Sequence, residues 1–480
     1  MDIKPVNNSW KQKLLQLVYK PVDNSPLILF RIGFGFLLFY HCISFIQQGK
    51  VFIYFIEPPF TFTFIGFEFL QPLPGNGMYF YFGLMALFGL MIMLGAWYRF
   101  SMVLFTLLWT GIYLMQKSGY NNHYYLICLL CWLMCFMPAN KNYAIDVWRK
   151  PQIKEYTCPH WIPLLFITQT AIVYFFAATS KLNGDWLSGK FIALQFEGLS
   201  KHHWLGFIYG NSVFQQMICY GGLLFDFFIV PLLLWKKTRK PAFALFCLFH
   251  LFNSYSFRIG IFPYLSITMA VFFFNAETIR KIFFRKEPAI PVAQPTTVNL
   301  NPGKKLLAFF LAVYLIFQLY LPMRSWFYPG NVFWTEEGYR MSWKMMLRKK
   351  TGTITFKLHD PVSGKTWVDD PLQKFKPQQV YWIAICPDIA WQYAQRLKKD
   401  YNKKGFPHLE IYAIDSVRLN NSHPQLLINP NVDLATIQWQ VFRHAAWLMP
   451  FNPDFAVEIV ARVSGYFLDE RIVNYSEFKK

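Results

Sequence analysis

Charged residues are scarce in this chain of 480 residues, at 15%, against about 25% in average soluble domains. Cysteine is also rare, with 8 residues in all, and Cys386 is the only one after position 322. The C-terminal region therefore cannot rely on an internal disulfide. No Gly-rich phosphate loop, metal-ligand spacing, paired carboxylates or Ser–His–Asp order is evident. Nucleotide binding, metal binding and hydrolase chemistry thus have no candidate residues.

Long apolar runs are abundant instead. Hydrophobic residues make up 54% of the chain, and before position 323 they gather in runs of about the 20 residues that a helix needs to cross a bilayer. A large soluble helical core is the alternative, but such a core favours amphipathic helices. We predict about nine spans, at 26–48, 77–98, 101–116, 123–138, 161–180, 213–235, 241–257, 259–275 and 305–322.

The basic residues predict an orientation, because cytoplasmic loops are enriched in Lys and Arg. With the N-terminus inside, the inner segments carry 19 Lys and Arg residues and the outer loops carry 6. This bias favours an extracytoplasmic C-terminal region. The formal net charge of +21 is then mainly a signal of topology, and it requires no nucleic-acid partner.

Three parts are expected along the chain. Residues 1–25 form a cytoplasmic N-terminal segment, 26–322 a polytopic α-helical transmembrane domain, and 323–480 an extracytoplasmic, β-rich mixed α/β domain. In this last part, 352–358, 380–385 and 409–414 are typical of strands, whereas 388–403 has the apolar spacing of a helix. A polar, Pro-rich stretch at 276–303 is expected to be an inner-face linker.

Ionisable and amide side chains inside membrane spans are costly, so each needs an explanation. Most of them fall near the predicted outer face. These residues are His41, Asn121, Asn122, His123, Lys181, His250 and Asn253. Only Gln169 and Asp226 fall near the middle of the membrane.

A cluster at one depth favours an enzyme that acts on a membrane-dissolved molecule. A transporter should instead line a path across the bilayer and bind near its middle. Lys181 alone could simply reach the interface, and His123 alone could be a packing residue, so the inference depends on their joint placement. A lysine in desolvated surroundings can act as a base near neutral pH, and histidine can assist proton transfer.

The motifs at these positions resemble the vitamin K-dependent γ-carboxylase family, with an HTTM-type membrane domain. In chain order they are YNNHYYL (120–126), FMPANKNYAIDVW (136–148), SKLNGDWLSG (180–189), GGLLFD (221–226), FHLFNSYSFRIGIFPYL (249–265), GYRMSWKMML (338–347), and LEIYAIDSVRLNN followed by INPNVDLATIQW (409–439). Their number, order and spacing make the resemblance specific.

The resemblance implies an enzyme that uses reduced vitamin K, O₂ and CO₂, without a metal, on a glutamate-containing protein or peptide. In this family a lysine deprotonates the hydroquinone, and reaction with O₂ produces a strong base. That base removes a γ-proton of glutamate, CO₂ adds to the carbanion, and vitamin K leaves as its 2,3-epoxide. No side-chain base could remove such a proton usefully at neutral pH.

The resemblance also assigns roles to residues. Lys181 matches the catalytic lysine, and Asn122 and His123 match an Asn–His pair that positions the hydroquinone and handles protons. Asn121, His250, Asn253 and Tyr339 are the expected substrate-binding residues, of which Tyr339 begins the outer domain. Surrounding lipid is the other expected partner.

Some features depart from the animal enzymes of the family. Ser180-Lys181 replaces their paired lysines, and loop 49–75 has no cysteine for their disulfide to the outer domain. We therefore expect a compact, bacterial inner-membrane member with its C-terminal domain in the periplasm. Three alternatives stay open: a hydroquinone epoxidase without efficient carboxylation, a non-catalytic quinone or lipid binder or transporter, and a related enzyme with another substrate.

Overall fold

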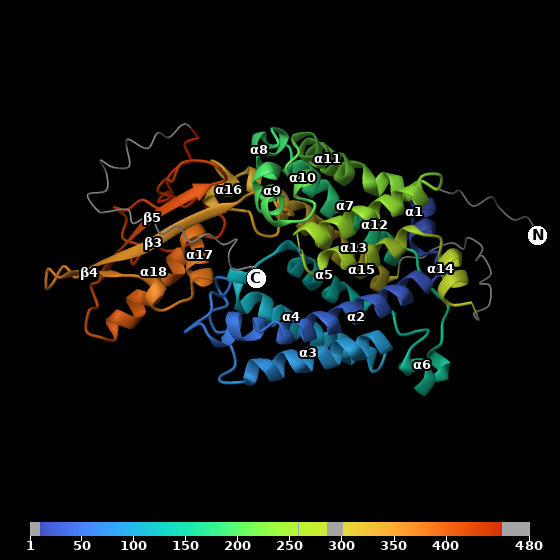
Figure 1. The fold of residues 1–480 in the computed structure, drawn as a ribbon. Helices are drawn as coiled ribbons and strands as arrows, with labels where there is room; N and C mark the ends of the chain where they lie inside the picture. The colour runs from blue at the N-terminus through green and yellow to red at the C-terminus, as the bar shows by residue number, and fades with distance from the viewer. Residues whose placement is uncertain (1–9, 258, 286–300, 454–480) are drawn as a thin grey trace, which may run out of the picture.

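The structure is a computed structural model that describes residues 10–257, 259–285 and 301–453. Each of the nine predicted spans corresponds to a helix. These helices are α2 (Ser25–Gln47), α3 (Gly77–Leu94), α4 (Tyr98–Met115), α5 (Asn122–Phe136), α7 (Trp161–Ser180), α11 (Ser212–Leu234), α12 (Arg239–Phe257), α13 (Phe262–Met269) and α15 (Pro302–Met323). Figure 1 shows them as one elongated block with the C-terminal domain at one end.

Not all nine helices qualify as membrane spans. Within the described ranges, six are long and apolar enough to cross a bilayer, namely α2, α3, α4, α7, α11 and α15. A seventh is counted only if α13 and α14 (Ala276–Phe283), which meet at a bend of 116°, form one broken span. Helix α5 has only 15 residues, and α12 begins with Arg239 and Lys240. The exact count of nine spans is therefore not confirmed.

Glycines allow the first two long helices to pack closely. A Cβ atom on Gly35 of α2 would lie 2.4 Å from the backbone nitrogen of Met93, and one on Gly89 of α3 would lie 2.7 Å from that of Phe39. Small residues at such crossings let helix backbones approach each other, which is how membrane helices gain packing contacts. Next to this crossing, the buried Arg31 donates to the carbonyl oxygens of Ala139 (3.1 Å) and Tyr143 (2.5 Å).

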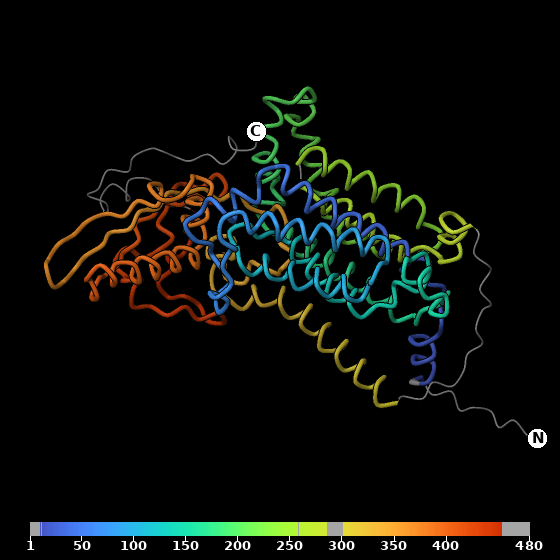
Figure 2. The backbone as a smooth tube through the Cα atoms, turned by 90° about the horizontal axis from the view of Figure 1, so that it is seen from below, coloured from blue at the N-terminus to red at the C-terminus, as the bar shows by residue number. Residues whose placement is uncertain are grey.

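Helix α15 lies apart from the other helices, along one side of the block (Figure 2). Most of its surface is exposed, as suits a helix that faces lipid. Polar contacts tie it to the bundle: among them, the Tyr314 hydroxyl donates to Gln169 Oε1 at 2.6 Å, and Gln318 Nε2 donates to the Tyr125 hydroxyl at 3.1 Å.

Short helices cover the end of the bundle that faces the C-terminal domain. They are α8 (Gly184–Leu187), α9 (Lys190–His202) and α10 (Gly206–Tyr209), which pack beside the N-terminal part of α11. Their buried side chains include Trp186, Phe191 and Phe196. The segment between α7 and α11 is thus a folded layer.

The C-terminal domain contains an antiparallel sheet in the order β4-β3-β5. The strands are β3 (Lys350–His359), β4 (Thr366–Asp369) and β5 (Glu410–Leu419), which confirms the predicted strands at 352–358 and 409–414. Helix α18 (Pro387–Asn402) confirms the helix predicted at 388–403. With α17 (Pro377–Ile385), it packs on the sheet.

The predicted strand at 380–385 is wrong, because these residues form the end of α17. Pro377 occupies the first turn, and the Gln379 side chain accepts from the backbone nitrogen of Lys376 at 3.2 Å, which closes the helix start. A short apolar run does not distinguish a strand from a buried helix. The domain is therefore less rich in strands than expected.

The loop between α2 and α3 reaches the C-terminal domain without a disulfide. Phe60 and Phe62 pack against Phe375, with ring centroids 5.2 and 5.9 Å away. The Gln392 side chain adds a hydrogen bond of 3.0 Å to the Thr63 carbonyl oxygen. Noncovalent contacts thus join this loop to the C-terminal domain. Of the predicted linker, residues 286–300 lie outside the described residues, as do Met1–Ser9 and Arg258.

Candidate active site

Lys181 follows the last residue of α7, and its side chain is buried between helices. It forms an ion pair with Asp226 of α11, and both residues are at least 90% buried. Its Nζ also lies 5.2 Å from the centroid of the Trp186 ring. A buried charge is tolerated when it is paired in this way. The pair places Asp226 and Lys181 at one depth, whereas the sequence analysis put Asp226 near mid-membrane and Lys181 at the outer end.

Tyr174 of α7 and His250 of α12 form a second buried pair. Tyr174 lies two helical turns before Lys181 in the chain. The Tyr174 hydroxyl lies 2.6 Å from His250 Nε2 of α12. The other ring nitrogen, Nδ1, is buried and has no hydrogen-bond partner among the described residues. Aromatic rings surround the histidine, with the centroids of Phe246 at 4.5 Å and Phe262 at 5.7 Å. The hydrogen bond between Tyr174 and His250 offsets the cost of burying the hydroxyl and Nε2, whereas the buried Nδ1 keeps its full desolvation cost.

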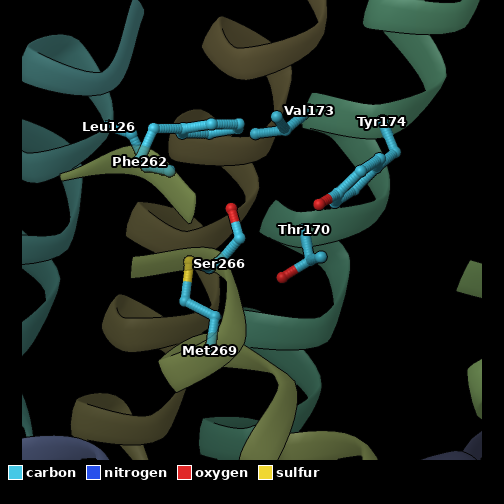
Figure 3. A pocket seen from close by; sticks show the side chains of 7 residues that line it. All are labelled: Leu126, Thr170, Val173, Tyr174, Phe262, Ser266 and Met269. Carbon is cyan, nitrogen blue, oxygen red and sulfur yellow. The ribbon is translucent and has the colours of Figure 1, made fainter. Parts of the chain in front are cut away.

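A small cavity lies beside this pair. Figure 3 shows the hydroxyls of Thr170, Tyr174 and Ser266 directed toward a common space. The other lining residues are Leu126, Val173, Phe262 and Met269. The cavity volume is about 10 Å³, which is about the space of one water molecule. A larger ring bound at this point must displace side chains.

His123 is linked to this region through Phe262, whose ring centroid lies 6.4 Å from that of His123 and 5.7 Å from that of His250. His123 also packs edge-on against Tyr124, at 4.9 Å. The turn before α13 approaches it closely, since a Cβ on Gly260 would lie 3.9 Å from His123 Nε2. The structure thus brings His123 and His250, both predicted site residues, into contact with the same aromatic ring.

The two asparagines before His123 make different contacts. Asn121 caps α5, since its side-chain oxygen accepts from the Tyr124 backbone nitrogen at 2.9 Å, which is a common structural role. Asn122 accepts from the Tyr120 hydroxyl at 2.9 Å and donates to the Lys344 carbonyl oxygen at 3.1 Å. Asn122 therefore connects the helices to the C-terminal domain.

Tyr339 lies in the same C-terminal segment, under the guanidinium of Arg348, which is 4.5 Å from its ring centroid. Burial raises the pKa of its hydroxyl. No hydrogen bond or ring contact joins Tyr339 to Lys181 or His123 among the described residues. Asn253 is half-buried one turn after His250, and it has no such contact with them either. Among the described residues, the structure therefore does not join these two predicted binding residues to Lys181 or His123.

Sequence reasoning missed two residues and underused a third. Asp226 was placed near mid-membrane, as a hint of a transport path, and its pairing with Lys181, 45 residues away, gave no local signal. Tyr174 gave no signal, because aromatic residues make up 20% of the chain and no local pattern distinguishes this one. Lys344 was part of a quoted motif without a role, yet it is buried and its carbonyl oxygen holds Asn122. For Asp226, the available signal was a carboxylate at the end of the otherwise apolar GGLLFD motif.

Two models of protein families match the chain. A model of the HTTM domain matches residues 19–277, and a model of the vitamin K-dependent gamma-carboxylase lumenal domain matches residues 303–454. The first range contains Lys181, Asp226, His123 and His250, and the second contains Tyr339 and the lysine that holds Asn122. No solved structure matches the chain.

Proposed function

The chain belongs to the vitamin K-dependent gamma-carboxylase family, and on this premise we propose that it carboxylates protein glutamate with CO₂. In this proposal the carboxylation is coupled to oxygenation of reduced vitamin K to its 2,3-epoxide. The chain is an integral membrane protein with an HTTM domain. The observation that carries the proposal is the buried Lys181–Asp226 ion pair inside this apolar, helical domain.

The residues present offer aromatic and polar contacts to a flat, apolar ring that bears hydroxyl groups, once side chains are displaced to enlarge the cavity. Lys181 has an aromatic neighbour in Trp186, and a second aromatic ring, Phe262, contacts both His123 and His250. Nδ1 of His250 has no hydrogen-bond partner among the described residues, so it offers a polar atom to a ligand hydroxyl. When bound, reduced vitamin K and O₂ supply a stronger base than any side chain can provide.

Lys181 is the proposed base for the first step. In the ion pair, the Asp226 carboxylate can take the ammonium proton, which leaves a neutral amine that accepts a proton from a neighbouring hydroxyl. After this transfer Asp226 is still a carboxylic acid, and it pairs again with the protonated lysine as a carboxylate once it has released its own proton. The surrounding apolar side chains exclude water, which would otherwise quench a strong base.

His250 and His123 are proposed to orient the substrate. The Tyr174 hydroxyl bonds to Nε2 of His250, which fixes the direction of its free Nδ1. His123 is half-buried and has no hydrogen-bond partner among the described residues, so its ring is available to hold or pass a proton. Asn122 joins this region to the C-terminal domain, from which the glutamate substrate is proposed to approach.

The proposed location is a bacterial inner membrane with the C-terminal domain in the periplasm. The charge bias between the loops supports this orientation. The site lies at the end of the helical block that faces the C-terminal domain, so a quinone from the lipid and an exported glutamate can meet there. The polar residues near mid-membrane are engaged within the bundle, Asp226 by Lys181 and Gln169 by Tyr314, which favours an enzyme over a transporter.

The test is an assay of both half-reactions. The purified protein is incubated with reduced vitamin K, a glutamate-containing peptide and labelled bicarbonate. We expect the epoxide together with label in the peptide, and neither product when reduced vitamin K is replaced by its quinone. If no epoxide forms, the proposal is wrong.

An epoxidase without carboxylation is the second candidate. It is favoured by the position of the Lys181–Asp226 pair, because both residues belong to the helical domain and the pair needs no residue of the C-terminal domain. Epoxide without labelled peptide, over a range of peptide sequences, would retain this candidate and remove the carboxylase.

A further inference from the structure

The segment 336–346 of the C-terminal domain, which we name the docking loop, has an unusual backbone. Four of its non-glycine residues have left-handed conformations: Glu336, Met341, Trp343 and Met346, with φ between 52° and 63°. Large side chains rarely adopt this region, and they keep it only when the surroundings enforce it. The contacts that enforce it are therefore informative.

The docking loop is seated on the N-terminal end of α5. The Trp343 side chain is fully buried, and its ring centroid lies 5.1 Å from that of Tyr125. The Met341 backbone nitrogen donates to the Tyr120 hydroxyl at 2.5 Å, and Asn122 donates to the Lys344 carbonyl oxygen. Since the Tyr120 hydroxyl in turn donates to Asn122, the loop determines the orientation of the Asn122 side chain.

A buried cluster of charges holds the loop in this position. Asp388, at the start of α18, contacts the Arg340 guanidinium of the docking loop at 2.7 and 3.2 Å. Its Oδ2 also lies 2.6 Å from Nζ of Lys117, which belongs to the short turn between α4 and α5. Asp388 is 6% exposed and Lys117 2% exposed. One carboxylate thus joins the loop, α18 and the helical domain.

The three groups keep their charges at neutral pH. Burial alone would raise the pKa of Asp388, but Arg340 and Lys117 hold it well below its usual range. Burial lowers the pKa of Lys117 to about 8, and Asp388 opposes this change. Breaking one member of such a buried cluster leaves the others unpaired, so the whole cluster responds to one substitution.

We infer that Asp388 is a positioning residue that seats the docking loop on α5, through Arg340 and Lys117, and thereby orients Asn122 for the carboxylation half of the reaction. The catalytic part of this role rests on the proposed function. The Lys181–Asp226 pair lies outside the cluster, so oxygenation depends on Asp388 less than carboxylation does.

The test compares Asp388→Asn and Lys117→Met with Asp369→Asn. Asp369 is a matched control, since it is equally buried and binds Lys374 and the Tyr393 hydroxyl within the C-terminal domain. Amide hydrogen exchange is measured in the full chain. For the two test variants we expect amide exchange at least about tenfold faster in 117–122 and 338–347. Exchange in 350–359 and 410–419 should stay unchanged. The control variant should leave exchange in 117–122 and 338–347 unaffected.

The catalytic readout is the ratio of fixed label to epoxide. Asp388→Asn and Lys117→Met should lower this ratio about tenfold and raise KM for the peptide more than KM for reduced vitamin K. Asp388→Glu and Lys117→Arg should restore part of it. Wild-type exchange and a wild-type ratio in both test variants would overturn the inference. If the wild-type protein forms no epoxide, the proposed function fails, and the exchange result still decides the docking role.

Discussion

Buried charges are arranged differently in the helical domain and in the C-terminal domain. In the helices, Lys181 and Asp226 form a single pair. In the C-terminal domain, Glu336 contacts Arg348 at 2.7 Å and Lys350 at 3.6 Å, and Asp388 likewise has two basic partners. A carboxylate between two cations keeps its charge, whereas a single pair in apolar surroundings can exchange a proton between its members.

The difference suggests that the pair serves chemistry and the networks serve architecture. Arg348 illustrates the second role. Burial lowers the pKa of its guanidinium, but Glu336 and Tyr339 raise that pKa by more than burial lowers it, so Arg348 stays charged. It stacks on Tyr339 and fixes the start of the docking loop. Variants in the two domains should therefore differ in what they disturb first: the first chemical step in the helices, and folding or the seating of the docking loop in the C-terminal domain.

The largest expected effect is that of Lys181→Ala. Epoxide formation should fall about 1000-fold or more, since general base catalysis contributes about 100- to 10,000-fold. An added small amine should restore part of the activity. The measurement is the initial rate of epoxide formation, with Lys190→Ala as the control because Lys190 is a nearby exposed lysine. Full activity of Lys181→Ala would show that this lysine is not the base.

Glu336→Gln should break a network without touching the pair. It leaves Arg348 and Lys350 buried without a carboxylate, so we expect a loss of about 3 kcal/mol in the free energy of unfolding. Denaturant unfolding of the detergent-solubilised protein measures this loss. Glu410→Gln, on a partly buried strand position, is the control. Equal stability of the two variants would contradict the architectural role.

Asp226→Asn should test whether the single pair exchanges a proton. The amide keeps the shape of the carboxylate but cannot take the ammonium proton, so we expect epoxide formation to fall about 100-fold. The free energy of unfolding of the C-terminal domain should stay the same. The rate and the unfolding are measured on one preparation. A loss of stability without a loss of rate would make the pair architectural.

His123→Ala should separate the two half-reactions. We expect fixed label to fall about tenfold more than epoxide, because the histidine is proposed to handle protons during carboxylation, while KM for reduced vitamin K changes little. The measurement is the label-to-epoxide ratio, with His160→Ala as the control. His160 contacts Leu17 at 2.8 Å, on an exposed part of the chain. An unchanged ratio would remove His123 from this step.

The smallest effect concerns Lys344, a buried cation of the C-terminal domain for which no ion pair is found among the described residues. Burial lowers its pKa to about 8. The unfolded chain then binds more protons than the folded one between pH 8 and about 10.5, so stability due to this group rises with pH over that range. The difference between wild type and Lys344→Met should show this rise, while Lys344→Arg, which stays charged, should lack it. A flat difference would mean that Lys344 is paired.

Much of the fold could be predicted because its signals are local. Each of the nine apolar segments is a helix, and so is the amphipathic stretch that became α18. The errors occur where a local pattern is ambiguous. The apolar run at 380–385 suits a strand and a helix equally, and only the cap at Pro377 and the packing of α17 decide for the helix. The number of spans stays open because α5 and α13 are short and α12 begins with two basic residues.

The candidate site was predictable in its residue types and less so in its contacts. Polar groups in apolar segments indicated Lys181, His123 and His250, and the structure relates the two histidines through Phe262. Their catalytic roles stay predictions. Asn121 is a helix cap, and Asn122 binds the docking loop rather than only facing a ligand. A side chain's partner cannot be deduced from its own neighbours in the chain.

The sequence by itself determined that this protein inserts helices into a membrane, because transfer of an apolar segment to lipid depends on that segment's own residues. It also indicated the family, through motifs that are continuous in the chain. Only the tertiary structure paired Lys181 with Asp226, 45 residues away, and Asn122 with Lys344, 222 residues away. Such pairs depend on how whole helices pack and how the C-terminal domain docks, and no local pattern of residues specifies them.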